Sequence, residues 1–115
     1  MINPLSYDLC DKTVTVYRME NGEITSNILE NAFFQWSKTL KNEEYGDAYQ
    51  VEALLIVPCG ELCIQPGDRV LEGVGPEIAS DQWDCFVPAL VQGLYELKTV
   101  KPCYWQGTLC HVEGR

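Results

Sequence analysis

The dipeptide Asn21-Gly22 constrains the fold most, because it stands between two segments that both have strand character. On its N-terminal side, Thr13 to Arg18 (TVTVYR) alternates around β-branched residues, and a returning strand is expected from Ile24 onward. Asn-Gly favours the two-residue turn whose twist matches that of paired strands. The sequence therefore predicts a β-hairpin close to its start.

The segment after this turn is ITSNILENAFFQW, which fits helical and strand periodicity each in part. The preceding turn and the pair Phe33 and Phe34 favour a strand, with a bend near Asn31. From Ser37 to Tyr49 the sequence becomes polar, with only scattered apolar side chains. We expect an exposed loop or mobile arm there, because loops of this length in small domains are usually functional or disordered.

Two further strands are predicted in the middle of the chain. Val51 to Pro58 (VEALLIVP) is a near-continuous apolar run of strand length, and we expect it to form the central strand. A turn at Pro66-Gly67-Asp68 leads into the short strand Asp68 to Glu72, which Gly73 closes. The run Val51 to Pro58 is too short for a helix.

The last part of the chain is predicted to contain one short helix and two strands. Ser80 is expected to cap a helix that ends near Phe86, before Pro88. Gly93 to Val100 and Thr108 to Val112 follow as strands, joined across the turn-rich KPCYWQG.

These signals sum to about six short strands and one short helix, without an internal repeat. The chain has 115 residues, of which 46% are apolar, and this is about the size of one typical domain. We therefore expect a single mainly-β domain over residues 1–115. Its predicted form is a small antiparallel β-barrel or sheet with a long polar loop at 37–49.

The glycine-rich stretch IQPGDRVLEGVGPEI (Ile64 to Ile78) raises the question of phosphate binding. A dinucleotide fingerprint requires a strand, G-x-G-x-x-G and then a helix within a βαβ unit. Here Gly73-Val74-Gly75 is followed by Pro76 in an antiparallel context. The glycines and prolines are better explained as turn residues that redirect the chain.

The charge balance excludes one large class of partners. Against 8 Lys and Arg stand 17 Asp and Glu, which gives a net charge of −9. Nucleic-acid binding needs clustered cations, so direct binding to DNA or RNA is not expected. No apolar run reaches the length of a membrane span, and the start MINPLSYDLCDK lacks the features of a signal peptide. We expect a cytoplasmic protein without membrane contact.

Six cysteines would indicate disulfides in a secreted chain, but the cytosol would keep them reduced, as small core residues. One zinc-ligand set can be written from the sequence: Cys59, Cys63, Cys110 and His111. The tight paired spacing of structural zinc sites is missing, so we expect no metal.

No set of residues specifies a reaction, and we expect no catalytic residue and no cofactor. His111 is the sole histidine, and in a strand its neighbour Cys110 would point to the opposite face. Glu43 and Glu44 lie in the polar arm, where solvation makes them ordinary carboxylates. Asp68 follows a glycine in a turn and is explained as a turn former.

Three stretches stand out when the chain is taken as a whole: NPLSYDLCDKTVTVYR, LLIVP followed by PGDRVLEGVGPEI, and YELKTVKPCYWQGTLCHVE. Together they resemble the minor capsid or head-tail connector proteins of tailed bacteriophages and prophages. The resemblance spans nearly the whole chain. Its most recognisable parts are Gly67-Asp68-Arg69-Val70 with the following Gly73, Gly93 to Lys101, and Trp105 to Glu113.

The resemblance implies a structural virion protein, a head-closure subunit that forms a ring under the portal. Its partners would be copies of itself, the portal or adaptor protein and the tail-completion protein, first in the bacterial cytoplasm and then in the virion. An acidic ring lumen would let DNA pass without specific binding. Contacts are expected from the arm, with Leu40, Glu43, Glu44 and Tyr45, and from Tyr104 and Trp105, which fall in a turn-rich segment.

Three alternatives remain open from the sequence. The chain could be another virion part, such as a tail-completion protein. It could be a small metal-binding or enzymatic β domain that uses the cysteines and His111 named above. It could also be a β-barrel that binds a small ligand or peptide in an enclosed apolar pocket.

Overall fold

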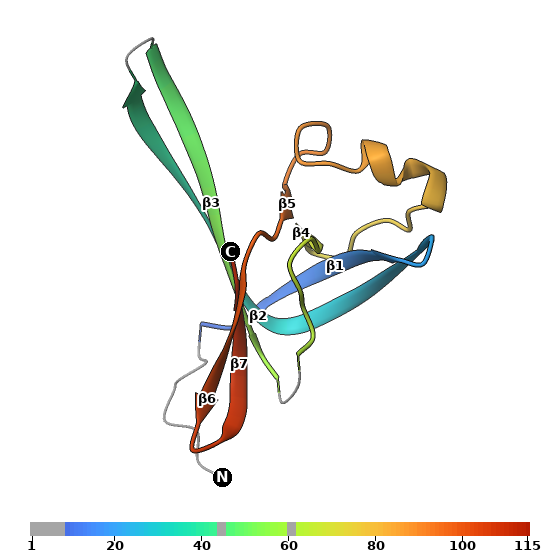
Figure 1. The fold of residues 1–115 in the computed structure, drawn as a ribbon, viewed down its shortest axis with the longest axis vertical. Coiled ribbons are helices and arrows are strands. Elements are labelled where there is room, and N and C mark those ends of the chain that lie inside the picture. Colours follow the sequence, from blue (N-terminus) through green and yellow to red (C-terminus); the bar gives the residue numbers. More distant parts are fainter. Residues whose placement is uncertain (1–8, 44–45, 60–61) are drawn as a thin grey trace.

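A computed structural model gives the architecture of the chain and describes residues 9–43, 46–59 and 62–115 (Figure 1). In these ranges it has seven strands and one short 3-10 helix: β1 (Lys12–Glu20), β2 (Glu23–Glu43), β3 (Gly46–Pro58), β4 (Arg69–Glu72), η1 (Ser80–Cys85), β5 (Leu94–Glu96), β6 (Val100–Trp105) and β7 (Thr108–Gly114). The expected mainly-β fold is confirmed, with seven strands in place of about six.

All strands belong to one antiparallel sheet in the order β5-β4-β1-β2-β3-β7-β6. The sheet is curled into a half-barrel. Its curl brings β5 back toward β2, where the ring of Tyr95 meets that of Trp36 edge-on, with centroids 5.4 Å apart. The apolar run Val51 to Pro58 lies in β3, an interior strand beside β2.

β2 is one long strand that belongs to two ladders. Its first part, Glu23 to Ala32, pairs with β1, and its second part, from Phe33 to Glu43, pairs with β3. The change of partner coincides with Asn31, whose φ is 60°, and with a register shift between Lys12 and Val14. The predicted bend near Asn31 is therefore confirmed, as a β-bulge.

Two tight turns close the hairpins on either side of the sheet. Asn21 and Gly22 have φ of 52° and 79°, which is the type I′ pattern and confirms the first hairpin. Gln106 and Gly107 repeat it with 48° and 79°. The segment before this second turn was expected to be turn-rich, but it is β6, paired with β7, so Tyr104 and Trp105 lie in a strand.

The polar segment 37–49 is not an irregular loop in its described residues. Its backbone continues β2 as far as Glu43 and resumes as β3 at Gly46, with a regular register from Ser37 opposite Glu52 to Glu43 opposite Gly46. Backbone pairing does not require apolar side chains, so a polar sequence can sustain it. Figure 1 shows this hairpin extending away from the rest of the molecule.

Apolar side chains pack on both faces of β1. Val14 and Val16 point into the main core, which also holds Phe34, Leu55 and Val112. The alternate residue Tyr17 points to the other face, into a second cluster with Phe86 and Leu94. The segment between β4 and β5, which includes η1, covers this second face.

The Gly73-to-Pro76 loop is fastened to β1. Thr15 Oγ1 donates to the Gly73 carbonyl at 2.7 Å and accepts from the Gly75 N–H at 2.9 Å, and the Tyr17 hydroxyl donates to the Pro76 carbonyl at 2.7 Å. The Gly75 N–H thus faces the sheet, as a turn role requires and a phosphate cradle does not.

The short helix η1 is held on the sheet by Arg69. Its Nη1 donates to the carbonyls of Trp83 and Phe86, at 2.6 and 2.7 Å, and its guanidinium lies 3.7 Å from the centroid of the Trp83 ring. The helix was expected to be capped by Ser80, but Ala79 occupies the N-cap position and its N–H donates to the Gln82 side chain instead.

The strand predicted at Gly93 to Val100 is divided. β5 ends at Glu96, Leu97 exchanges backbone hydrogen bonds with Gly67 and Asp68, and β6 begins at Val100. Leu97 is 1% exposed, so this break places a core side chain between two strands. In the described ranges, no helix has the length and apolar character needed to cross a membrane.

Candidate functional site

Strands β6 and β7 bring three potential ligand side chains together. Cys103 lies directly opposite His111 in the ladder, and Glu113 lies two residues further along β7. Residues opposite each other and residues two apart share one face of a sheet, so all three side chains leave the same face. His111 Nε2 lies 3.2 Å from Glu113 Oε1, and the His111 side chain is 8% exposed.

The residue opposite His111 is Cys103 and not its sequence neighbour Cys110. A register shift places Cys103 opposite His111 and Tyr104 opposite Leu109, so Cys110 falls at a bulge. Its thiol contacts the Thr108 carbonyl at 3.5 Å. Sequence reasoning missed Cys103 and Glu113 as neighbours of His111. The Gln106-Gly107 turn alone would place Cys103 opposite Cys110, and the bulge that moves His111 into that place has no signal in the sequence.

The thiol of Cys103 is in an environment that keeps it protonated. Burial raises its pKa above the ordinary value, and the adjacent Glu113 carboxylate raises the pKa further by charge and by hydrogen bonding. A neutral thiol beside an imidazole and a carboxylate is not an activated nucleophile, which requires a depressed pKa. The same three donors are, however, ligand types that a borderline-soft metal accepts.

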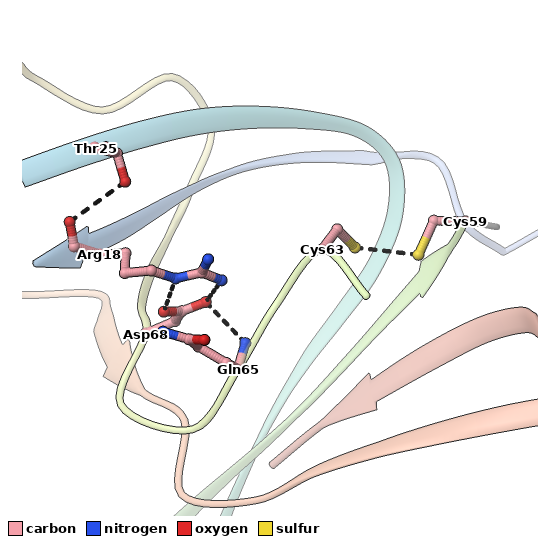
Figure 2. A network of polar contacts seen from close by, with 6 residues as sticks. All are labelled: Arg18, Thr25, Cys59, Cys63, Gln65 and Asp68. Atoms are coloured by element: carbon pink, nitrogen blue, oxygen red, sulfur yellow. Dashed lines mark hydrogen bonds and ion pairs between the residues drawn. The ribbon is translucent and has the colours of Figure 1, made fainter. Parts of the chain in front are cut away.

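A pair of thiols lies against the main core, apart from the Cys103 cluster. Cys59 Sγ and Cys63 Sγ are 3.1 Å apart, and both residues pack against the main core (Figure 2). Burial and the contact with Cys59 raise the pKa of Cys63 to about 12. The zinc set written from the sequence is therefore divided in the described structure: Cys59 and Cys63 face each other, whereas His111 groups with Cys103 and Glu113.

Asp68 is more than a turn former. Its carboxylate accepts from Arg18 Nε at 2.9 Å and from Arg18 Nη2 at 2.8 Å, and it also accepts from the Gln65 N–H at 2.9 Å (Figure 2). The Asp68 side chain is 1% exposed and that of Arg18 is 25% exposed. The bond to Asp68 raises the pKa of Arg18, so the guanidinium remains charged. This network gives Asp68, in the sequence Gly67-Asp68-Arg69, a structural role: it joins β1 to the turn before β4.

The predicted contact residues occupy two separate parts of the sheet. Leu40 and Glu43 lie in β2, in the extended hairpin. Glu44 and Tyr45 lie outside the described residues. Tyr104 and Trp105 are on the edge strand β6, with 62% and 42% of their surface exposed. Exposed aromatics of this size are enriched at protein interfaces.

A hollow of about 620 Å³ lies next to Trp36 at the base of the hairpin. Its lining is formed by Trp36 and by the segment around β5: Pro88, Gln92, Gly93, Leu94, Tyr95, Glu96 and Lys98. The hollow combines an aromatic pair with charged residues at the point where the sheet curls.

Comparison of the chain with protein-family models, with curated proteins and with solved structures gives no match. The arrangement of the residues themselves must therefore carry any functional conclusion. It offers a thiol-imidazole-carboxylate cluster, an extended hairpin and a pair of exposed aromatic rings.

Proposed function

We propose that the protein is a structural subunit of a tailed-phage virion, a head-tail connector or head-closure protein that assembles as a ring under the portal. The observation that supports this proposal best is the paired hairpin of β2 and β3. Beyond the half-barrel, the described residues of β2 and β3 pair only with each other.

The pairing pattern explains why such a hairpin suits assembly. β1 accompanies β2 only as far as Ala32, and β7 accompanies β3 only from Leu55 onward. In the described part of the hairpin, the outer edge of each strand therefore has no neighbouring strand in the sheet. Open strand edges bind other chains by backbone hydrogen bonding, which provides affinity without requiring apolar side chains.

The acidic composition agrees with this role. A net charge of −9 opposes adhesion to DNA, which a subunit around a DNA passage must avoid. Tyr104 and Trp105, exposed on the edge strand β6, give a second surface for a neighbouring subunit or the tail. Weak subunit contacts of this kind become strong when a portal ring presents many sites at once.

The test uses an inducible prophage from which this reading frame is deleted and is then supplied in trans. Electron microscopy of the deletion is expected to show separate tails beside heads that have lost their DNA, and the wild-type copy should restore joined particles. Intact, infectious virions from the uncomplemented deletion would overturn the connector proposal.

A shortened hairpin tests the proposed contact element separately. Replacing Leu40–Tyr49 by Asn-Gly removes whole rungs of the ladder and keeps Thr39 opposite Gln50. This variant is expected to fold, as judged by circular dichroism and cooperative unfolding, but not to restore joining. Normal joining by the folded variant would remove the hairpin from the interface.

A further inference from the structure

The cluster of Cys103, His111 and Glu113 has no part in the proposed assembly role. The paired register of β6 and β7 sets its geometry, with Cys103 opposite His111. His111 is buried, and the other two residues are half-buried. The cluster is therefore closed on the side of His111 and can be reached from solvent on the side of Cys103 and Glu113. Two rigid strands joined by a two-residue turn hold all three residues.

The distances within the cluster are close to those of a coordination shell. The sulfur, one ring nitrogen and one carboxylate oxygen all lie within 4.8 Å of one another, and the nitrogen and oxygen are 3.2 Å apart. Around a tetrahedral zinc with bonds of about 2.0 to 2.3 Å, neighbouring ligand atoms are roughly 3.3 to 3.7 Å apart. Metal binding would therefore require side-chain rotations that bring the ligand atoms from within 4.8 Å to this range.

We propose that Cys103, His111 and Glu113 form a three-ligand site for a Zn²⁺ ion. Thiolate, imidazole and carboxylate are the three ligand types that zinc uses in proteins, whereas Mg²⁺ and Ca²⁺ require oxygen ligands. Three protein ligands leave one tetrahedral position for water. On binding, the Cys103 thiol gives up its proton to solvent and the thiolate sulfur bonds to the metal.

The pair of Cys59 and Cys63 fits a cation less well than this cluster. The charge of Arg18 acts on the Cys63 thiol, and a guanidinium disfavours a divalent ion nearby. Beside the Cys103 cluster, Lys101 is opposite Glu113 but is exposed, so its flexible side chain can turn toward water. The proposed zinc site is therefore placed on one face of the β6–β7 hairpin.

The experiment is a zinc titration of the full chain by calorimetry, after metal removal and with a reductant present. We expect one zinc per chain for the wild type. A tetrahedral Co²⁺ spectrum with a thiolate charge-transfer band should confirm sulfur ligation. Cys103→Ser is expected to weaken zinc binding more than about 100-fold, because even changes in the outer shell of a zinc site cost 10- to 100-fold.

Serine variants of other cysteines are the matched controls. They show whether the loss of any thiol weakens zinc binding or only the loss of a ligand. Cys85 is exposed and Cys110 is the sequence neighbour of His111, so Cys85→Ser and Cys110→Ser should bind zinc like the wild type. Glu113→Gln, at a half-buried position, should weaken binding at least 10-fold. Absence of zinc binding, or unchanged binding by Cys103→Ser, or loss of binding by Cys59→Ser, would overturn the proposal. None of these outcomes bears on the connector role.

Discussion

Asp68 is clamped by Arg18 through two parallel hydrogen bonds, although the residues are 50 positions apart in the sequence. The pair joins β1 to the turn that starts β4. Asp68→Asn should lower the free energy of unfolding by about 3 kcal/mol, because it leaves a partly buried guanidinium without its counter-charge. Denaturant unfolding measures the difference, with the exposed Asp84→Asn as control. Equal stability of the two variants would contradict this assignment.

Gly75 and Tyr17 form a second long-range contact that can be tested by substitution. A Cβ at position 75 would collide with the Tyr17 hydroxyl and touch Leu71. Gly75→Ala should therefore cost about 1 to 3 kcal/mol of stability. In a Tyr17→Phe background the obstructing oxygen is gone, and the cost of Gly75→Ala should become smaller. A double-mutant cycle of unfolding free energies gives the coupling, and a coupling of zero would argue against the collision.

The Cys63 thiol should react slowly with alkylating reagents. Its ionisation should also make the free energy of unfolding depend on pH in the alkaline range. Its pKa, raised to about 12 mainly by burial, keeps the thiol protonated, so alkylation at pH 8 should modify the exposed Cys85 first. Between pH 9 and 12 the native state holds this proton more tightly than the unfolded chain does, so the stabilisation decreases as the pH rises. Mass spectrometry of alkylated peptides measures the order of reaction.

The pH effect needs a comparison, because other thiols also ionise in this range. The stability difference between the wild type and Cys63→Ser should shrink from pH 8 to pH 11, since serine has no proton to lose there. A difference that stays constant with pH would show that the Cys63 environment does not favour the thiol.

Asn31 should tolerate glycine but not a branched residue. Its φ of 60° is accessible to asparagine and glycine, and its side chain is exposed, so little packing is lost on substitution. Asn31→Val should reduce stability by about 1 to 2 kcal/mol, and Asn31→Gly should be close to neutral. Thermal and denaturant unfolding of the two variants give the contrast, and equal losses would remove the backbone explanation.

Patterns formed by residues close together in the sequence predicted much of the fold. Asn21-Gly22 predicted its hairpin, and the bend at Asn31 and the strand closed by Gly73 were also found. The polar segment from Ser37 was expected to be an exposed loop or mobile arm, and its described residues form paired strands in place of an irregular loop. Strand propensity comes largely from side-chain packing and says little about backbone pairing in an extended hairpin.

The candidate metal site could not be predicted, because it depends on the register between strands. A single bulge at Cys103 and Tyr104 decides that His111 meets Cys103 and leaves Cys110 aside. In the same way, Asp68 shows only a turn signal in the sequence, and its partner Arg18 lies on a strand that no local pattern connects to it.

The bend at Asn31 gives the molecule a mechanical property. Because β2 runs without interruption from the hairpin into the ladder with β1, no loop absorbs a load applied to the hairpin. Asn31 lies between the two ladders of β2, with the β1 pairing on one side and the β3 pairing on the other. A sideways pull on the hairpin is therefore transmitted through β2 to β1, which contributes Val14 to the main core and Tyr17 to the second cluster.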